Sequence, residues 1–257
     1  MGLNARLKRI HGNLRYGIRS RAGKCFICGK RSLFACGSDN LKESLRCIYC
    51  GGISRSRMIA SALCEVFQTR SLGRLPSELA IYEAQATGPI HQALKHMENY
   101  SCSEYFEDTP SGEVKNGIRS ENIESLSFEN GSFDVVIHQS VLEHVRHPLK
   151  ALQECYRVLR RSGHLIFEVP MCDYWSPFIR GKSRPRIDVS GDNDVEILPP
   201  FYHKDPLRPE GILVYTDFGL DVGNELTSMG FEINWLIERF NRSRMSHSVV
   251  AVCKRHA

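Results

Sequence analysis

Two pairs of cysteines constrain the fold of this chain more than any other feature of its sequence. Cys25 and Cys28 form one Cys-x-x-Cys pair, and Cys47 and Cys50 form a second pair after 18 intervening residues. Two residues between thiolates allow one tight turn to place both sulfur atoms about 2.3 Å from a single tetrahedral metal ion. The spacing therefore predicts a zinc site with four sulfur ligands.

Four sulfur ligands fill the coordination shell of zinc and leave no position for water, so we expect a structural metal rather than a catalytic one. Gly29 and Gly51 each follow a cysteine pair directly and supply the backbone freedom that such turns use. Redox-active pairs and thiols without metal remain open alternatives, and Cys36 is a badly spaced substitute ligand. We interpret residues 23–56 as a loop-rich, zinc-ribbon-like module with four cysteine ligands.

The cysteine content also bears on the compartment. Ten cysteines would suggest a disulfide scaffold in a short secreted chain, but the N-terminus, MGLNARLKRIHGNLRYGIRSR, lacks the apolar segment of a signal peptide. No apolar run approaches the roughly 18 to 20 residues that span a bilayer. We therefore expect a soluble protein with no transmembrane segment, in a reducing, cytoplasmic setting.

Charge is distributed unevenly along the chain. Residues 1–60 contain 13 Lys and Arg residues against Asp39 and Glu43, a balance of +11, so residues 61–257 carry −6. This asymmetry indicates that residues 1–60 contact RNA or an anionic surface. Residues 1–22 fit a basic amphipathic arm that could pack on its own protein, on a membrane or on RNA, because apolar residues recur every three or four positions: Leu3, Leu7, Ile10, Leu14 and Ile18.

The pattern changes after the cysteine module. Residues 57–78 are interpreted as a bridging helix, from Arg57 to Thr69, and a linker. Strand-like apolar runs then alternate with helix-like segments, which is typical of a parallel sheet with helices on both faces. The clearest helix runs from His147 to Leu159, with Gly163 just past its end. The predicted strands are LAIYEA, YSCSEYF, FDVVIH, HLIFEVP, FEINWLI and SVVAVC.

The segment ENIESLSFENGSFDVVIHQSVLEHVRHPLKALQECYRVLRRSGHLIFEVP, residues 121–170, closely resembles the second half of a class I methyltransferase domain of the type 11 group. The positions that match are Asn122, Leu126, Phe128 and Ser132-Phe133-Asp134. The later segment EGILVYTDFGLDVGNELTSMGFEI is also similar, so the resemblance covers about residues 79–254. It implies a Rossmann-like α/β methyltransferase domain at residues 79–257, with a seven-stranded, mostly parallel sheet and helices on both faces. It further implies an enzyme that uses S-adenosylmethionine.

The resemblance also implies where this cofactor binds, at the carboxyl ends of the strands. The residues at the matching positions are Glu83 and Gly88 around the first turn, Glu104 for the ribose hydroxyls, Asn122 and Ile123 for the adenine, and Gln139, with Ser140, for the methionine end. Family members usually carry several glycines in the first turn, whereas this chain reads EAQATG. Alanine disfavours a left-handed backbone, so we expect another loop conformation, and weak or absent cofactor binding is an open alternative.

Methyl transfer needs an in-line approach and requires a base only for nucleophiles such as hydroxyls. The candidate catalytic residues are His144 and His203, because neutral imidazole can accept a proton near pH 7, although a structural role is the alternative for each. We interpret residues 171–215 as a long loop that forms a lid-like insertion over the acceptor. Its aromatic residues and histidine are Tyr174, Trp175, Phe178, Tyr202 and His203.

Three functions are consistent with these features. The leading hypothesis is methyl transfer to an oxygen or nitrogen of a small-molecule or sugar-containing, glycan-type acceptor. The second is an RNA base methyltransferase, since a zinc module ahead of a class I domain resembles bacterial ribosomal RNA guanine methyltransferases, and the basic residues 1–60 could neutralise phosphates. The third is a non-catalytic binding protein that kept the fold and lost the cofactor, because the EAQATG loop is altered.

Overall fold

The computed structural model describes residues 17, 20–38, 40–171, 182–191, 193–204, 208–239 and 247–256. The predicted basic arm at residues 1–22 therefore lies mostly outside the described residues. The chain divides into two compact units. We call residues 1–76, 87–96 and 237–248 the cysteine unit, and residues 77–86, 97–236 and 249–257 the sheet unit. Within the described ranges, none of the helices has the length and apolar character needed to cross a membrane.

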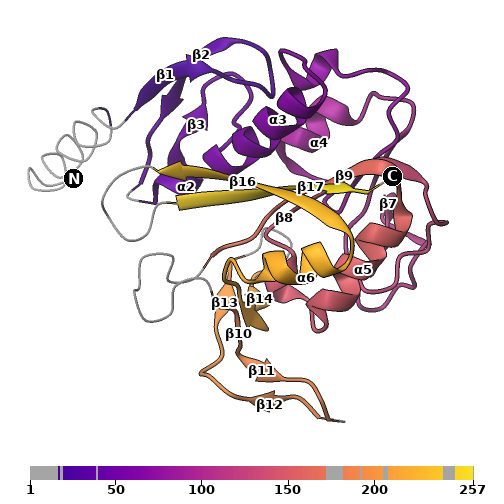
Figure 1. Cartoon of the computed structure of the whole chain (residues 1–257). Coiled ribbons are helices and arrows are strands. Elements are labelled where there is room, and N and C mark those ends of the chain that lie inside the picture. The colour runs from indigo at the N-terminus through magenta and orange to yellow at the C-terminus, as the bar shows by residue number, and fades with distance from the viewer. Residues whose placement is uncertain are drawn as a thin grey trace, which may run out of the picture. The chain divides into compact units, whose positions relative to one another are not determined.

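A small antiparallel sheet carries the cysteine pairs in the cysteine unit. Its strands, drawn in indigo in Figure 1, follow the order β1 (Arg21–Lys24), β2 (Arg31–Ala35) and β3 (Arg46–Cys47). The first cysteine pair lies in the turn between β1 and β2, and the second begins at the end of β3. The sequence indicated only loops here, because β3 has two residues and the buried positions of β2 are a serine and a phenylalanine, Ser32 and Phe34, which give no apolar alternation.

The helices of the cysteine unit follow this small sheet. They are α2 (Leu41–Ser44), α3 (Ser54–Val66), the 3-10 helix η1 (Leu72–Arg74) and α4 (Gly88–Leu94). The bridging helix α3 begins and ends three residues before the predicted bounds, and it buries Ile59 and Leu63 completely, as its apolar stripe predicts. Helix α3 contacts α2, η1 and α4, and this packing gives the unit its own apolar core.

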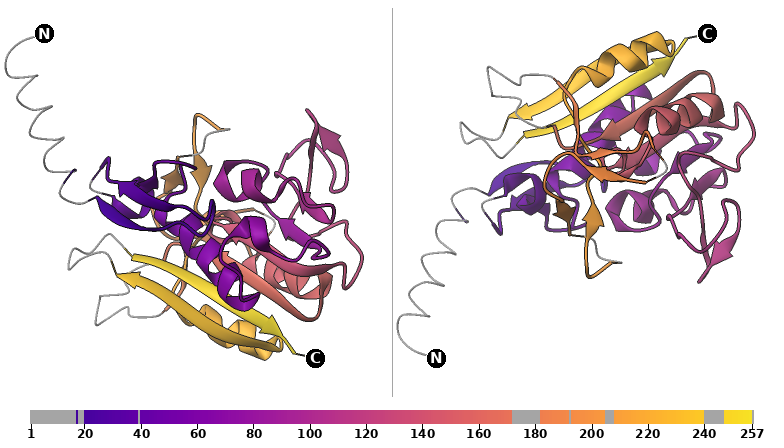
Figure 2. Two further views of the ribbon diagram at one scale, coloured as in Figure 1. Left: turned by 90° about the horizontal axis from the view of Figure 1, so that it is seen from above. Right: turned by 90° about the horizontal axis from the view of Figure 1, so that it is seen from below.

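The sheet unit is built on six strands in the order β16-β17-β9-β8-β4-β5 (Figures 1 and 2). Strands β5, β4, β8 and β9 are parallel to their neighbours, and β17 is antiparallel to β9. All six lie where the apolar runs predicted strands: β4 (Ile81–Glu83), β5 (Tyr100–Cys102), β8 (Phe133–Gln139), β9 (Leu159–Glu168), β16 (Phe231–Arg239) and β17 (His247–Arg255). The parallel strands therefore end at one common edge of the sheet.

The described residues contribute six strands to this sheet, whereas the resemblance implies seven. Beyond β5 the chain forms only one parallel bridge, between Glu104 and Ser120. The Glu104 N–H donates to the Arg119 carbonyl oxygen, and the Glu121 N–H donates to the Glu104 carbonyl oxygen, both at 3.0 Å. Just before the bridge, residues 114–119 pair with one another as the hairpin β6 (Val114–Lys115) and β7 (Ile118–Arg119), so a longer strand does not form there.

Helices α5 (Pro148–Val158) and α6 (Val222–Ser228) cover one face of the large sheet (Figure 1). Val136 and Leu165, from neighbouring strands, pack in one core cluster with Leu152 of α5 and Leu226 of α6. Burying a leucine side chain of this kind contributes about 2 to 3 kcal/mol. The prediction of helices on both faces is thus confirmed for the face that α5 and α6 cover.

The end of α5 corrects one expectation. The sequence predicts Gly163 just past the end of the helix, but strand β9 begins at Leu159, directly after α5, and Gly163 lies inside that strand. A Cβ atom at Gly163 would lie 2.9 Å from the Arg160 carbonyl oxygen and 3.1 Å from that of Asp134. The glycine is therefore required by close backbone approach in the sheet, and it does not cap the helix.

Within the segment predicted as a long loop, residues 171–215, the described residues contain short paired strands. The pairs, orange in Figure 2, are β10 (Arg184–Pro185) with β15 (Thr216–Asp217), β11 (Ile187–Asp188) with β12 (Val195–Glu196), and β13 (Tyr202–His203) with β14 (Ile212–Leu213). Each strand has two residues, too few for a strand pattern to appear in the sequence. Three of the aromatic residues assigned to a lid, Tyr174, Trp175 and Phe178, lie outside the described residues.

Candidate active site and metal centre

The four paired cysteines come together as their spacing predicts. Their Sγ atoms all lie within 4.8 Å of one another, with 3.6 Å between Cys25 and Cys50 and 3.8 Å between Cys28 and Cys47. Sulfur ligands of one tetrahedral zinc ion lie about 3.8 Å apart, so the four thiols fit this metal. Cys36, the weaker candidate, is not part of the cluster.

The two cysteine turns are built alike. The Gly29 N–H donates to the Cys25 carbonyl oxygen at 2.7 Å, and the Gly51 N–H donates to that of Cys47 at 2.9 Å. The glycines have φ angles of 75° and 71°, in the left-handed region that side chains disfavour. The glycines predicted to shape the turns therefore do so by the same geometry in both.

Arg57 of α3 fastens the second turn to the rest of the cysteine unit. Its guanidinium donates to the carbonyl oxygens of Leu45 and Gly52, the latter at 3.0 Å. The same group lies 3.8 Å from the ring centroid of Phe34 on β2. This arginine is buried, so its charge serves the packing of the module and is not presented to a polyanion.

Polar side chains gather at the carboxyl ends of the parallel strands in the sheet unit. Glu83 ends β4, where its neighbours in register are Cys102 on β5 and Ile137 on β8. Gln139 ends β8 opposite Glu168, the last residue of β9. Ligands of open α/β sheets bind beyond this edge, so it is the candidate cofactor site.

Glu83 is a buried carboxylate with one acceptor atom unused. The Tyr100 hydroxyl donates to Glu83 Oε2 at 2.7 Å, while Oε1 has no hydrogen-bond partner among the described residues. Burial raises the pKa of Glu83 to about 8, and the Tyr100 hydrogen bond opposes this only in part. A buried acceptor without a donor fits a ligand that brings one, such as the ammonium group at the methionine end of S-adenosylmethionine.

The altered loop after β4, EAQATG, is hydrogen-bonded to the side chain of Glu104. The Ala86 N–H donates to Glu104 Oε1 at 2.9 Å, and the Ala84 N–H donates to the Ile137 carbonyl oxygen at 2.9 Å. None of residues 84–87 has a positive φ, so the loop takes the alternative conformation that its alanines require. Gly88 alone is left-handed, with φ of 87°, and it begins α4.

A second polar group lies at the ends of β8 and β9. The Ser140 hydroxyl donates to Glu168 Oε2 at 2.9 Å, and the Ser140 N–H donates to the Glu168 carbonyl oxygen at 2.8 Å. The Gln139 amide lies 3.5 Å from the side-chain oxygen of Gln85 in the altered loop. Glu168 is completely buried and was missed in the sequence, where its signal was a carboxylate at the carboxyl end of an apolar strand.

Asn122 and Ile123, the two residues predicted to contact adenine, both have structural roles in their own surroundings. Asn122 Oδ1 accepts the Glu124 N–H at 2.9 Å, and the Asn122 N–H donates to the Ser111 hydroxyl at 2.9 Å. Ile123 is buried in the core cluster together with Tyr82. Asn122 thus forms the turn, and contact of either residue with adenine stays a prediction.

The two predicted catalytic histidines meet, although 59 positions separate them. His144 lies in the 3-10 helix η2 (Leu142–His144) and His203 on β13, with 3.1 Å between Nε2 of the first and Nδ1 of the second. Glu143 Oε1 is 3.7 Å from His144 Nε2 and 3.5 Å from His203 Nδ1. Glu143 was missed because a carboxylate in a short surface-like motif gives no sign of burial.

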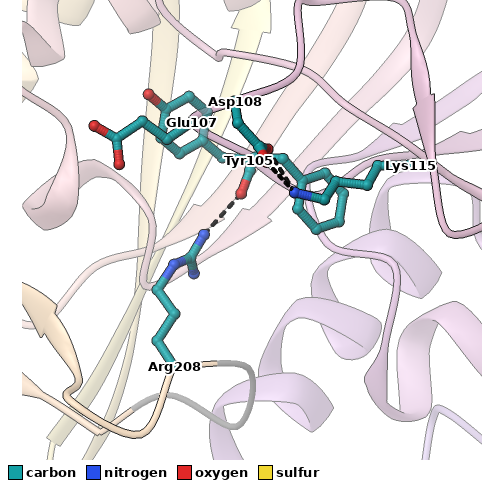
Figure 3. A pocket seen from close by; sticks show the side chains of 6 residues that line it. Tyr105, Glu107, Asp108, Lys115 and Arg208 are labelled. Atoms are coloured by element: carbon teal, nitrogen blue, oxygen red, sulfur yellow. Dashed lines mark hydrogen bonds and ion pairs between the residues drawn. The ribbon is translucent and has the colours of Figure 1, made fainter.

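A hollow of about 380 Å³ adjoins the segment that follows Glu104 (Figure 3). It is a shallow hollow that is widely open to solvent. The Arg208 guanidinium donates to the Tyr105 carbonyl oxygen at 2.7 Å, and the Lys115 ammonium donates to the Asp108 carboxylate at 2.5 Å. Arg208 belongs to the predicted lid segment, so that segment reaches the wall of this hollow. The lining residues are Tyr105, Phe106, Glu107, Asp108, Lys115 and Arg208.

A mostly parallel sheet with carboxylates at its strand ends defines a Rossmann-like, cofactor-binding α/β domain. Residues 90–167 match the model of a family described as a methyltransferase domain. The chain therefore carries a methyltransferase domain and is an S-adenosylmethionine-dependent methyltransferase. This agrees with the resemblance seen in the sequence and disfavours a purely non-catalytic binding protein.

Several solved structures are similar to this chain at low sequence identity. A SAM-dependent methyltransferase of Methanosarcina mazei has 18% identity and a TM-score of 0.43, covering 71% of this chain and 94% of its own. An S-adenosylmethionine-dependent methyltransferase of Listeria monocytogenes has 16% identity and a TM-score of 0.46, covering 77% and 100%. One from Mesorhizobium loti has 17% identity and a TM-score of 0.45, covering 76% and 98%. A comparison with curated proteins gives no match.

Proposed function

We propose that this methyltransferase acts on an oxygen or nitrogen of a small-molecule or sugar-containing acceptor. The observation that carries the proposal is the open hollow of about 380 Å³ in the segment that follows Glu104. Arg208 and Lys115 line it together with carboxylates, a polar set suited to hydroxyl-rich molecules.

The cofactor would be held by the residues at the strand ends. Glu83 Oε1, buried and without a donor among the described residues, would accept the ammonium group of the methionine end, beside Gln139. Glu104, which already orders the loop through Ala86, would accept the ribose hydroxyls. The adenine would contact Asn122 and Ile123, and Gly88 would allow close approach at the start of α4.

S-adenosylmethionine, when bound, supplies an activated methyl group on a sulfonium sulfur. Its transfer would need an acceptor oxygen or nitrogen held in line with the carbon–sulfur bond, and a group that helps the acceptor to lose its proton. We assign the promotion of this proton loss to the group formed by His144 and His203, which lies just beyond the end of β8. The hairpins of residues 182–215 would exclude water from the reaction.

We further propose that Cys25, Cys28, Cys47 and Cys50 hold one structural zinc ion. The two matching turns and the sulfur separations support this assignment. The proposed organisation is an arm at residues 1–22, the zinc module at 23–56, a bridge at 57–78 and the methyltransferase domain at 79–257. We also propose a reducing, cytoplasmic location, the setting in which paired cysteines bind metal and do not form disulfides.

Methylation of an RNA base is the second candidate, favoured by the charge of +11 on residues 1–60. One structural observation weakens it. The Lys24 ammonium lies 5.1 Å from the Phe26 ring and that of Lys30 lies 4.7 Å from the Tyr49 ring, so lysines of the chain itself cover the aromatic faces that would stack on bases.

Calorimetry of the purified full chain with S-adenosylmethionine tests the proposal first, and we expect micromolar affinity. Absence of binding would overturn methyl transfer by this chain. The acceptor class follows from incubation with methyl-labelled cofactor and either a small-molecule extract or total RNA. Label in the small-molecule fraction supports the proposal, whereas label only in RNA would replace it with the second candidate.

A further inference from the structure

Glu143, His144 and His203 form a compact set of potential metal ligands in the sheet unit. Glu143 Oε1 lies 3.7 Å from His144 Nε2 and 3.5 Å from His203 Nδ1. The two imidazole nitrogens are 3.1 Å apart. Ligands about 2.05 Å from a tetrahedral ion lie about 3.3 Å from one another. The three measured separations bracket this value.

Glu143 is buried in a way that favours a cation between the three side chains. Its side chain is only 2% exposed, and neither carboxylate oxygen has a hydrogen-bond partner among the described residues. An ionised carboxylate buried without donors is strongly destabilising unless a positive charge or a metal compensates it. The polar side-chain atoms that lie near it are His144 Nε2 and His203 Nδ1, both of which can be metal ligands.

The surrounding backbone orients the histidines as ligands. His144 Nδ1 lies 2.7 Å from the Leu213 carbonyl oxygen, so Nδ1 carries the proton and the lone pair of Nε2 points toward Glu143 and His203. Histidine ligands of metals ordinarily donate their other ring N–H to a carbonyl or carboxylate in this way. Leu213 lies on β14, which pairs with the strand that carries His203, so one hairpin fixes both imidazoles.

A further backbone bond ties this hairpin segment to η2. The Tyr215 N–H, two residues beyond Leu213, donates to the Glu143 carbonyl oxygen at 2.7 Å. The three candidate ligands are thereby held in register by bonds that involve none of their ligand atoms. Exposure increases from Glu143 to His144 at 11% and His203 at 30%, which leaves the outer side of the set open.

We propose that Glu143, His144 and His203 bind one divalent transition-metal ion of the zinc class, with a fourth coordination position open to an oxygen ligand. Two imidazoles and one carboxylate are the donor set of catalytic zinc and of related open sites, whereas magnesium and calcium prefer oxygen ligands alone. The site is separate from the cysteine cluster, which is closed and built from sulfur.

Without metal, the same atoms form a hydrogen bond between the two histidines. Metal binding replaces this bond, because His203 Nδ1 must then present a lone pair and its proton moves to Nε2. The role of this site in methyl transfer rests on the proposed function: the open coordination position would bind an acceptor hydroxyl and favour loss of its proton. His144 and His203 would then assist the loss of the proton as ligands of the metal, and the proton would pass to water on the open side of the set.

Cobalt titration of the metal-stripped full chain tests the site. Cobalt bound by the cysteines gives sulfur-to-metal charge-transfer bands, whereas cobalt bound by oxygen and nitrogen gives only weaker visible bands, so the two sites are counted separately. We expect the unaltered chain to bind one equivalent without charge-transfer absorption. Glu143→Gln and His203→Ala should lose that equivalent and keep any charge-transfer bands.

His147→Ala is the matched control, because His147 is an exposed histidine three residues from His144, and this variant should bind as the unaltered chain does. Glu143→Gln preserves shape, and His203 is partly exposed on a short hairpin, so both variants should keep the thermal unfolding transition. The proposal is overturned if the unaltered chain binds no such equivalent, or if the equivalent persists in both variants. Calorimetry with S-adenosylmethionine on the same samples reports the proposed function independently of this count.

Discussion

The Glu104 carboxylate accepts the backbone N–H of Ala86 at 2.9 Å. A residue just after β5 therefore orders the loop that follows the neighbouring strand, β4. The loop lacks the glycines usual at this place, and this bond replaces backbone freedom with a fixed charge-assisted contact. Glu104 thus has two roles in the proposed site, one on the loop and one on the ribose.

Glu104→Ala should therefore weaken S-adenosylmethionine binding by about 10- to 100-fold, the worth of one or two hydrogen bonds to a charged group. Titration calorimetry measures the change. Glu107→Ala is the matched control, because Glu107 is three residues away on the rim of the hollow and is not placed on the cofactor. Equal affinity in the Glu104 variant and the unaltered chain would remove Glu104 from the cofactor site.

The raised pKa of Glu83 makes stability depend on pH. Between its ordinary value of 4.5 and about 8, the folded chain holds a proton that the unfolded chain has released, so this group's contribution to stability falls as pH rises through that window. Glu83→Gln removes the titration. The free energy of unfolding of the variant, relative to the unaltered chain, should rise from pH 5 to pH 8 by at least about 1.4 kcal/mol, the worth of one pKa unit.

Urea unfolding of both proteins at several pH values provides this comparison. A difference between the two proteins that does not change with pH would contradict the assignment of a buried, proton-binding Glu83. Because the variant keeps the shape of the side chain, the Tyr100 contact is preserved as a neutral hydrogen bond.

His138 should give the opposite dependence of stability on pH. It is completely buried on β8 and stacks on Phe167 with ring centroids 4.9 Å apart, and neither ring nitrogen has a hydrogen-bond partner among the described residues. Burial lowers the pKa of His138 to about 3, so the unfolded chain alone binds a proton between pH 6.5 and 3, and stability falls as pH drops through that window.

His138→Leu should therefore be more stable than the unaltered chain, by about 1 to 3 kcal/mol at pH 7 from removal of an unsatisfied polar group, and by more at pH 5. Thermal unfolding at both pH values measures the gain. A loss of stability at both would show that the imidazole has a partner that matters, and would reject this account.

Removal of metal should unfold the cysteine unit selectively. Chelation, or Cys47→Ser, removes the cross-link between the two cysteine turns, and small zinc modules depend on their metal for folding. We expect hydrogen exchange to accelerate at β2 and α3 while β8 and β9 keep their protection. Cys36→Ser should keep the metal, because Cys36 is outside the cluster. Unchanged exchange after chelation would reject a structural zinc.

Local patterns predicted much of this structure, and long-range contacts account for what was missed. The six strands and α5 follow from apolar runs and periodicity, and the cysteine cluster follows from spacing that a single turn can satisfy. Contacts such as that between His144 and Leu213, 69 positions apart, leave no local trace. For the same reason the sequence showed the two histidines but not the buried Glu143 between them.

Two regions differ from what was expected: the described residues after β5 form no seventh strand of the large sheet, and those of residues 171–215 contain short strands in place of a loop. Both regions form strands of two residues, and an alternation of period two cannot be seen over two positions. At Gly163 the sequence suggested a helix stop, whereas the actual constraint is close backbone approach, from the Arg160 carbonyl oxygen within the same strand and from that of Asp134 on the neighbouring strand.

The cysteine unit is assembled from three stretches of chain, residues 1–76, 87–96 and 237–248. It is therefore not an interchangeable cassette at the front of a catalytic domain, although its cysteine pairs all precede residue 51. A recombination breakpoint near residue 78 would leave α4, from residues 87–96, without the α3 and η1 against which it packs. Homologous exchange of this module would have to carry α4 as well, which ties the inheritance of the metal module to that of the helix directly after the EAQATG loop.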